Sequence, residues 1–341
     1  MAGFYDFGPP GCSLQANIIE TWRRHFILEE DMLEVDSPVI TPYPVLKASG
    51  HVDRFCDFVV KDSSNGEILR ADHVVEEVLE TRLKGDKEAR GEKLEAVDSA
   101  KKKKKKKLKG NTATEALKLD DAVVQEYSEI LAKIDNYDSV GLSELISKHD
   151  IRNPSSGNKF DLPVYTQNLM FAVSVGSANL PAYLRPETAQ GHFLNFSKLL
   201  EFNQQSMPFA SASIGKSGRN EISPRSGLLR VREFLMAEVE HYVDPEGGKK
   251  HHRFHEAADV KINLLDRHVQ LAGKTDAIPI TIGEAVQTGA VDNETIGYFM
   301  ARIQLFLVKL GLDPNKIRFR EHMENEMGKL LYVLGHTLAF S

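Results

Sequence analysis

Hydrophobic side chains recur at helical spacing near the start of the chain. Leu14, Ile18, Trp22 and Phe26 would form one apolar face with charged residues beside it, which predicts a helix over residues 14–30. The same kind of spacing predicts helices in four later segments, at residues 123–134, 193–200, 260–271 and 294–312. Each of these helices would bury one face and leave the other in water.

Alternating apolar and polar residues predict strands in two regions. The first, residues 32–40, is interrupted by Pro38, which cannot donate to a sheet ladder and so marks an edge, a bulge or an interface strand. The second, residues 209–243, predicts two strands joined by a loop around residues 223–227. Together with the helices, these strands predict an α+β fold in which an antiparallel sheet is flanked by helices.

The predicted hairpin carries charged residues on one face. Arg219 and Glu221 are two residues apart on the first strand, and Glu238 and Glu240 are two apart on the second. If these carboxylates are buried together, they need Mg²⁺, an ammonium group or arginine partners, because repulsion and desolvation are costly. A site for a polyphosphate and an amino acid would supply the first two. The charge pattern alone leaves open a set of exposed ion pairs.

The composition changes between residues 61 and 160. This stretch is rich in Glu, Lys and Asp, and it contains seven consecutive lysines at residues 101–107. Because such a run repels itself, we expect a solvated, partly helical insertion within a larger domain. A dedicated arm that contacts RNA is the alternative.

The bulk composition narrows the class of protein. The 341 residues, 41% of them hydrophobic, suffice for a sizeable core, and no apolar run approaches the roughly 18 residues that span a bilayer. Cys12 and Cys56 form no CxxC pair, so neither a disulfide framework nor a structural zinc site is indicated, and a cytoplasmic compartment is expected. The net charge of −6 argues against nonspecific nucleic-acid binding but allows a local basic face.

The segment Arg219–Glu240 resembles the second signature of class II aminoacyl-tRNA synthetases, an Arg-x-Glu strand, a loop and a returning strand rich in Phe and Glu. The order of residues in this segment is similar to that in eukaryotic and archaeal glycyl-tRNA synthetases in particular. Five further blocks carry the same resemblance in the same order, at residues 5–12, 47–53, 70–73, 183–191 and 318–327. The resemblance implies the class II catalytic fold with an inserted helical and charged subdomain.

The resemblance assigns an ATP site to the hairpin. Arg219 would hold the α-phosphate and stabilise the charge that develops during adenylate formation. Asn220 and Glu221 would lie in the same site, and Arg219 and Glu221 are the expected catalytic residues. Arg230 and Val231 would complete the nucleotide contacts as the chain returns from the loop.

The resemblance also implies how the amino acid is selected. Glu187 and Glu238 would bind the ammonium group of glycine, and Arg185 would balance these carboxylates or approach the substrate carboxylate. A tight acidic cavity leaves no volume at Cα, and forcing a methyl group into packed surroundings costs about 1–3 kcal/mol. Larger amino acids would therefore be excluded by volume.

The implied reaction is glycine–tRNA ligation, in which ATP activates glycine to glycyl-adenylate and the glycyl group passes to tRNA(Gly). ATP and Mg²⁺ would take part, with no dedicated metal site assigned to the protein. The helix at 14–30 and the strand around Pro38 resemble the first class II signature, which implies a homodimer interface; without the resemblance, Trp22 and Phe26 read as core residues. No membrane partner is expected, and a mitochondrial form in addition to the cytoplasmic one is left open.

The chain also departs from the family pattern. Gly218 stands where an aromatic residue is usual, and His192 replaces an aliphatic one. Residues 328–341 resemble no part of the family, so we expect an incomplete catalytic domain that lacks the third class II signature, and hence impaired activity of this chain.

The expected organisation is a catalytic start with the dimer helix and strand (1–60), an insertion (61–160), a catalytic core (161–327) and a divergent tail (328–341). Two rival functions remain. One is a class II synthetase of the seryl, prolyl or threonyl kind, against which the strings at 185–191 and 47–53 argue. The other is a non-catalytic dimeric or RNA-binding remnant.

Overall fold

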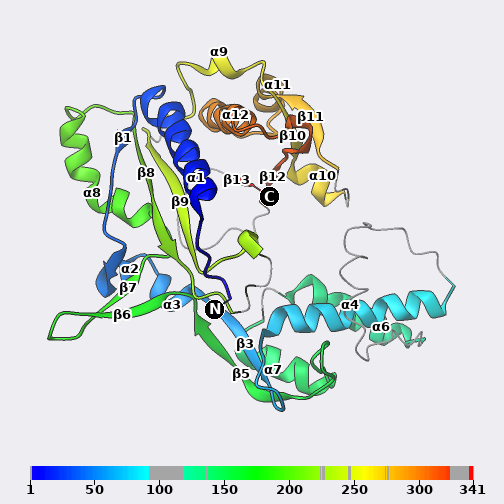
Figure 1. The fold of residues 1–341 in the computed structure, drawn as a ribbon. Helices are drawn as coiled ribbons and strands as arrows, with labels where there is room; N and C mark the ends of the chain where they lie inside the picture. Colours follow the sequence, from blue (N-terminus) through cyan, green and yellow to red (C-terminus); the bar gives the residue numbers. More distant parts are fainter. Residues whose placement is uncertain are drawn as a thin grey trace. The chain divides into compact units, whose positions relative to one another are not determined.

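The computed structural model divides the chain into two compact units (Figure 1). Unit 1 consists of Met1–Phe4, His51–Ala172 and Gly218–Glu233, and unit 2 of Tyr5–Gly50, Val173–Ser217 and Phe234–Ser341. The structure describes residues 2–91, 118–134, 137–222, 224, 227–244, 247–272, 274, 276–322 and 338–340. The lysine run at 101–107 and most of the tail lie outside the described residues.

Unit 1 is built on a three-stranded antiparallel sheet. Its strands follow the order β4 (Ile68–Arg70), β3 (Cys56–Asp62) and β5 (Phe160–Asn168). The helices of this unit are α3 (His51–Arg54), α4 (Ala71–Ala89), α6 (Asp121–Ala132) and α7 (Ser139–Lys148), followed by the short turn η3 (Gly227–Leu229). The helix predicted at 123–134 is therefore confirmed as α6.

The core of unit 1 lies between this sheet and its helices. Val75 and Leu79 are one helical turn apart on α4 and are fully buried, together with Val60 of β3 and Leu142 of α7. The spacing explains why α4 forms here, since its apolar face has a sheet and a second helix to pack against.

A buried carboxylate links the β3–β4 turn to the segment before β5. Asp62 accepts hydrogen bonds from the backbone of Ser64 and from the side chains of Asn153, Ser156 and Asn158, at 2.6–3.0 Å for the shortest bond to each. Burial opposes ionisation, but these donors prevail and hold the pKa of Asp62 below its ordinary value. The carboxylate thus fixes the loop at 153–158 to the sheet.

Unit 2 begins with α1 (Pro9–Trp22), which continues as the π-helical segment η1 (Arg23–Leu28). Trp22 and Phe26, each 6% exposed, pack on Ala210 and Ala212 of β8 (Phe209–Gly218). The helix predicted at 14–30 is confirmed, although it begins earlier, at Pro9, and ends at Leu28. These two aromatic side chains are core residues of the unit.

Two small sheets follow α1. β8 lies between β1 (Leu33–Glu34), to which it is parallel, and β9 (Glu233–Tyr242). The second sheet has the order β2 (Ile40–Pro42), β7 (Leu180–Leu184) and β6 (Phe171–Val175), with the helices α2 (Tyr43–Ala48) and α8 (Ala189–Phe202) nearby in the sequence. The two strands predicted over 209–243 are confirmed, and the strand predicted over 32–40 exists only at its ends.

The C-terminal part of unit 2 forms a further sheet and its helices. The strand order is β11 (Ile278–Thr281), β10 (Lys261–Leu265), β12 (Phe319–Glu321) and β13 (Leu338–Phe340). The helices are α9 (Phe254–Ala257), α10 (Arg267–Leu271), α11 (Ile282–Gln287) and α12 (Glu294–Lys309), and the turn η4 (Pro314–Lys316) precedes β12. The helix predicted at 294–312 is confirmed as α12.

The prediction of one helix over 260–271 is wrong. Residues 261–265 form β10, which pairs with β11 and β12, and α10 begins only after Asp266, whose side chain accepts from the backbone of Val269. The cause is a short run of apolar residues that fits a buried strand as well as a helix. The α+β class is confirmed, but the described residues form four small sheets, two of which include a parallel pair.

Close packing at Gly297 gives a test of the C-terminal core. A Cβ atom there would lie 2.9 Å from Val286 and 3.1 Å from Ile282, both on α11. We expect Gly297→Val to lower the free energy of unfolding by about 1–3 kcal/mol, because the branched side chain overpacks this contact. Urea unfolding measures it, with Leu305→Val on the exposed face of α12 as the control; equal effects of the two variants would contradict the packing.

Candidate active site

The residues predicted to bind nucleotide lie in unit 1, where the chain leaves β8. The strand ends at Gly218, so Arg219 and Glu221 do not lie on it, and the prediction that they share a strand face is wrong. The backbone N–H of Asn220 donates to Leu169 at 2.7 Å, and that of Glu221 donates back to Arg219 at 2.7 Å. These bonds turn the chain out of the ladder and form a loop.

An aromatic ring, that of Phe55, lies against the guanidinium of Arg219. The guanidinium carbon of Arg219 lies 5.5 Å from the centre of the Phe55 ring, a cation–π distance. At the neighbouring position, a Cβ atom on Gly218 would lie 3.3 Å from the ring of Phe171. The glycine therefore does not leave an empty space, because an aromatic side chain already packs against it.

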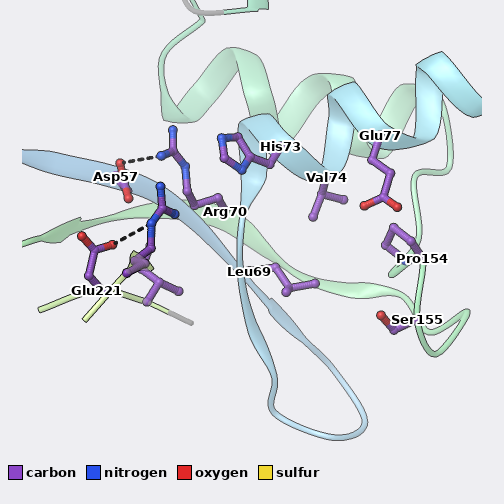
Figure 2. A pocket seen from close by; sticks show the side chains of 11 residues that line it. Asp57, Leu69, Arg70, His73, Val74, Glu77, Pro154, Ser155 and Glu221 are labelled. Atoms are coloured by element: carbon purple, nitrogen blue, oxygen red, sulfur yellow. Dashed lines mark ion pairs between the residues drawn. The ribbon is translucent and has the colours of Figure 1, made fainter. Parts of the chain in front are cut away.

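A cavity of about 200 Å³ opens next to this loop in unit 1 (Figure 2). Arg70 lies 3.5 Å from Asp57 and Arg230 lies 3.9 Å from Glu221, and both ion pairs are on the cavity wall. The complete lining is Asp57, Leu69, Arg70, His73, Val74, Glu77, Pro154, Ser155, Glu221, Ile222 and Arg230. The fold thus brings together two predicted nucleotide residues, Glu221 and Arg230, whereas Arg219, Asn220 and Val231 do not line this cavity.

The predicted glycine residues lie in unit 2, where Glu187 stands just before α8, Arg185 follows β7 and Glu238 is on β9. The backbone N–H of Thr188 donates to Glu238 at 2.6 Å, and the hydroxyl of Thr188 donates to the same oxygen. The side-chain amide of Gln190 donates to Glu187 at 2.7 Å. The N-terminus of a helix also favours negative charge. These contacts hold the two carboxylates in place.

A third carboxyl group, that of Glu240, belongs to the same cluster. Burial and, to a smaller extent, the charges of Glu238 and Glu187 together raise the pKa of Glu240 to about 7. Burial likewise raises the pKa of Glu238, although Thr188 lowers it through hydrogen bonds. The cluster therefore has an excess of negative charge that a primary ammonium group would neutralise.

Similarity to known proteins adds to this geometry. No protein-family model matches the chain. Over 330 residues, or 96% of its length, the chain is 61% identical to "Glycine--tRNA ligase 1, mitochondrial" of Saccharomyces cerevisiae, of which it spans 48%. It is 47% identical to "Glycine--tRNA ligase 2" of the same yeast and 47% identical to "Glycine--tRNA ligase" of Caenorhabditis elegans, again over 96% of the chain and over 48% and 40% of those proteins.

The chain is a relative of the eukaryotic glycine–tRNA ligases. It spans about half the length of the curated relatives it matches. Identity at this level extends along nearly all of the chain, so both units belong to this relationship.

Arg185 of this chain is bonded to the protein backbone. Its guanidinium donates to the backbone carbonyls of Lys216 at 3.0 Å and Ser37 at 2.8 Å, and the side chain is buried. The charge of Glu238 also acts on it, while burial lowers its pKa. His192 is fully buried, and its two ring nitrogens lie 2.6 and 2.8 Å from the hydroxyls of Ser211 and Ser213, with a pKa lowered by burial to about 4.

Three residues of these sites were missed by sequence reasoning. Thr188 donates to the carboxylate of Glu238, and Gln190 donates to that of Glu187. Asp57 pairs with Arg70 in the cavity. A threonine before a predicted helix is a recognised N-cap signal, but its bond to a carboxylate on a distant strand is not visible in the sequence. Across the described residues, no group of three or more His, Cys, Asp or Glu is arranged to hold a metal ion.

The raised pKa of Glu240 leads to a prediction about stability and pH. Its folded pKa of about 7 lies above the ordinary 4.5, so the folded chain binds the extra proton and loses stability as the pH rises through this window. We expect Glu240→Gln to raise the free energy of unfolding by about 1–2 kcal/mol at pH 8, after allowance for solvent screening, and to change it little below pH 4.5.

Denaturant unfolding at pH 8 and pH 4.5 measures this difference, with Glu201→Gln on the exposed side of α8 as the control. An equal effect of Glu240→Gln at both pH values would contradict the assignment.

Among the described helices, none is both long and apolar enough to span a membrane.

Proposed function

We propose that the chain is the catalytic part of a class II aminoacyl-tRNA synthetase that ligates glycine to tRNA(Gly). The observation that carries the proposal is the 61% identity to a glycine–tRNA ligase over 96% of the chain. The oriented pair of carboxylates at the start of α8 supports it, because it provides a place for the substrate's ammonium group.

The ATP side of the reaction rests on the loop after β8. Arg219, supported by Phe55, would hold the α-phosphate, and a guanidinium binds a phosphate through charge-assisted hydrogen bonds. Glu221 and its partner Arg230 would contact the nucleotide from the cavity wall, with Asn220 and Val231 beside them. Their proposed task is to position ATP and to stabilise developing charge.

The glycine side rests on the acidic cluster. Glu187 and Glu238 would accept hydrogen bonds from the ammonium group, and Arg185 would keep the surrounding backbone in place. The carboxylate of glycine would attack the α-phosphorus of ATP, the bond from that phosphorus to the bridging oxygen would break, and pyrophosphate would leave. A terminal ribose hydroxyl of the tRNA would then take the glycyl group and release AMP.

Mg²⁺ usually binds through ATP phosphates and only one or two carboxylates, and when bound it neutralises phosphate charge. Glu221 lies on the wall of the cavity beside Arg230, so it could supply one such carboxylate, and the described residues form no dedicated metal cage. Holding the phosphates remains the task of the arginines of the chain.

We also propose a homodimer and a cellular location. The exposed apolar side chains Leu14 and Ile18 on α1, with Val39 and Ile40 near β2, would form the homodimer surface. We assign the protein to the cytoplasm and, since one relative carries a mitochondrial name, also to mitochondria.

Glycine-dependent exchange of pyrophosphate into ATP tests the function. The chain should exchange pyrophosphate only when glycine is present. Exchange that serine, proline or threonine supports would indicate another class II specificity. Binding of tRNA without any exchange would indicate a non-catalytic remnant.

A further inference from the structure

One buried acceptor beside the acidic cluster has no donor. Gln190, 7% exposed, donates through its amide nitrogen to Glu187, while its amide oxygen is buried and has no hydrogen-bond partner in the described part of the chain. An unsatisfied buried acceptor costs about 1–3 kcal/mol. Such a group suggests that a donor is supplied by a ligand.

The orientation of this amide is determined by chemistry. An ionised carboxylate only accepts hydrogen bonds, so the nitrogen of Gln190 must face Glu187, and the oxygen must be the atom on the other branch of the carboxamide. The first turn of α8 fixes the position of the amide group, because Thr188 at the N-cap is itself held by Glu238. The orphan oxygen therefore belongs to an amide that is bonded to Glu187 and lies two residues from Thr188, which is held by Glu238.

We propose that Gln190 is a specificity-determining residue that accepts the third hydrogen of the substrate's primary ammonium group. This inference rests on the proposed glycine site and goes one step beyond it. A primary ammonium has three N–H donors, of which Glu187 and Glu238 take two, and the amide oxygen of Gln190 takes the remaining one. The site would thus select a primary ammonium over an N-alkylated one.

The contact predicts how substituted substrates behave. An N-methyl ammonium has one donor fewer, and it would give up the neutral amide before either carboxylate, because charge-assisted hydrogen bonds are about twice as strong. The loss of the Gln190 oxygen should therefore matter for glycine and hardly matter for N-methylglycine. A residue that only supports the fold would affect both ligands alike.

The experiment is a four-way comparison on the 341-residue chain. Dissociation constants for glycine and N-methylglycine are measured by calorimetry for the unsubstituted chain and for Gln190→Met. This variant keeps the length of the side chain and removes the acceptor together with the N–H that donates to Glu187, a loss that both ligands share. We expect Gln190→Met to weaken glycine binding about tenfold or more and N-methylglycine binding less than about threefold. Gln190→Asn, which withdraws the oxygen and keeps the amide, should show the same preference if Gln190→Met fails to fold.

Gln304→Met is the matched control, because Gln304 on α12 is also buried with an orphan amide oxygen, but no described bond links it to the carboxylates. It should leave both affinities unchanged. Equal weakening of both ligands by Gln190→Met and Gln190→Asn would overturn the inference and leave the proposed function intact. If the unsubstituted chain binds neither ligand, the proposed glycine site fails, and the inference fails with it.

Discussion

Arg219→Ala should slow glycine-dependent pyrophosphate exchange roughly 30-fold to 1,000-fold, because it should raise the activation free energy by about 2–4 kcal/mol. The guanidinium lies over the Phe55 ring at the end of β8, where it would meet the α-phosphate as negative charge develops. Because alanine leaves the backbone bonds of this loop in place, the loss should appear in kcat more than in the ATP requirement.

Arg152→Ala is the control for this experiment. Arg152 is an exposed arginine of the same unit, paired with Asp150 at 3.0 Å, and its removal should change exchange little. Arg219→Lys tests geometry as well as charge, because lysine lacks the planar fork of arginine and should restore only part of the rate. Exchange by Arg219→Ala within a few-fold of the unsubstituted enzyme would refute the role of Arg219.

Glu238→Gln should raise the glycine requirement about tenfold to a hundredfold, with a much smaller change for ATP. The amide still offers an oxygen to Thr188, so the start of α8 should stay in place while the negative charge that attracts the ammonium is lost. Steady-state pyrophosphate exchange at varied glycine and varied ATP separates these effects, with exposed Glu201→Gln as the control. Equal shifts for both substrates would instead make Glu238 a structural or metal-binding residue.

The sequence predicted those parts of the fold whose pattern has only one physical solution. The long apolar face of α12 and the paired strands β8 and β9 are of this kind. Residues 261–265 are not, because five residues with buried Ile262 and Leu264 suit a strand and a helix equally well, and only pairing with β11 decides. Local periodicity cannot contain that information.

The candidate site divides in the same way. Arg219, Glu187 and Glu238 were predicted because they stand in blocks that resemble a family, although the exact end of β8, and hence the loop position of Arg219, was not predicted. Thr188 and Gln190 became visible only through contacts made in the folded chain. Residue type and spacing indicate which chemistry is available, whereas the hydrogen-bond partner of each group depends on tertiary structure.

The bonds of Asp62 to Asn153, Ser156 and Asn158 have a consequence for the evolution and engineering of the chain. They join the end of β3, before α4, to the segment between α7 and β5, and β3 pairs with β5. Both ends of the intervening sequence are therefore attached to the same sheet. A single cut between α4 and α6 should leave two complementary fragments that remain associated through one hydrophobic core, which makes this position suitable for a split protein.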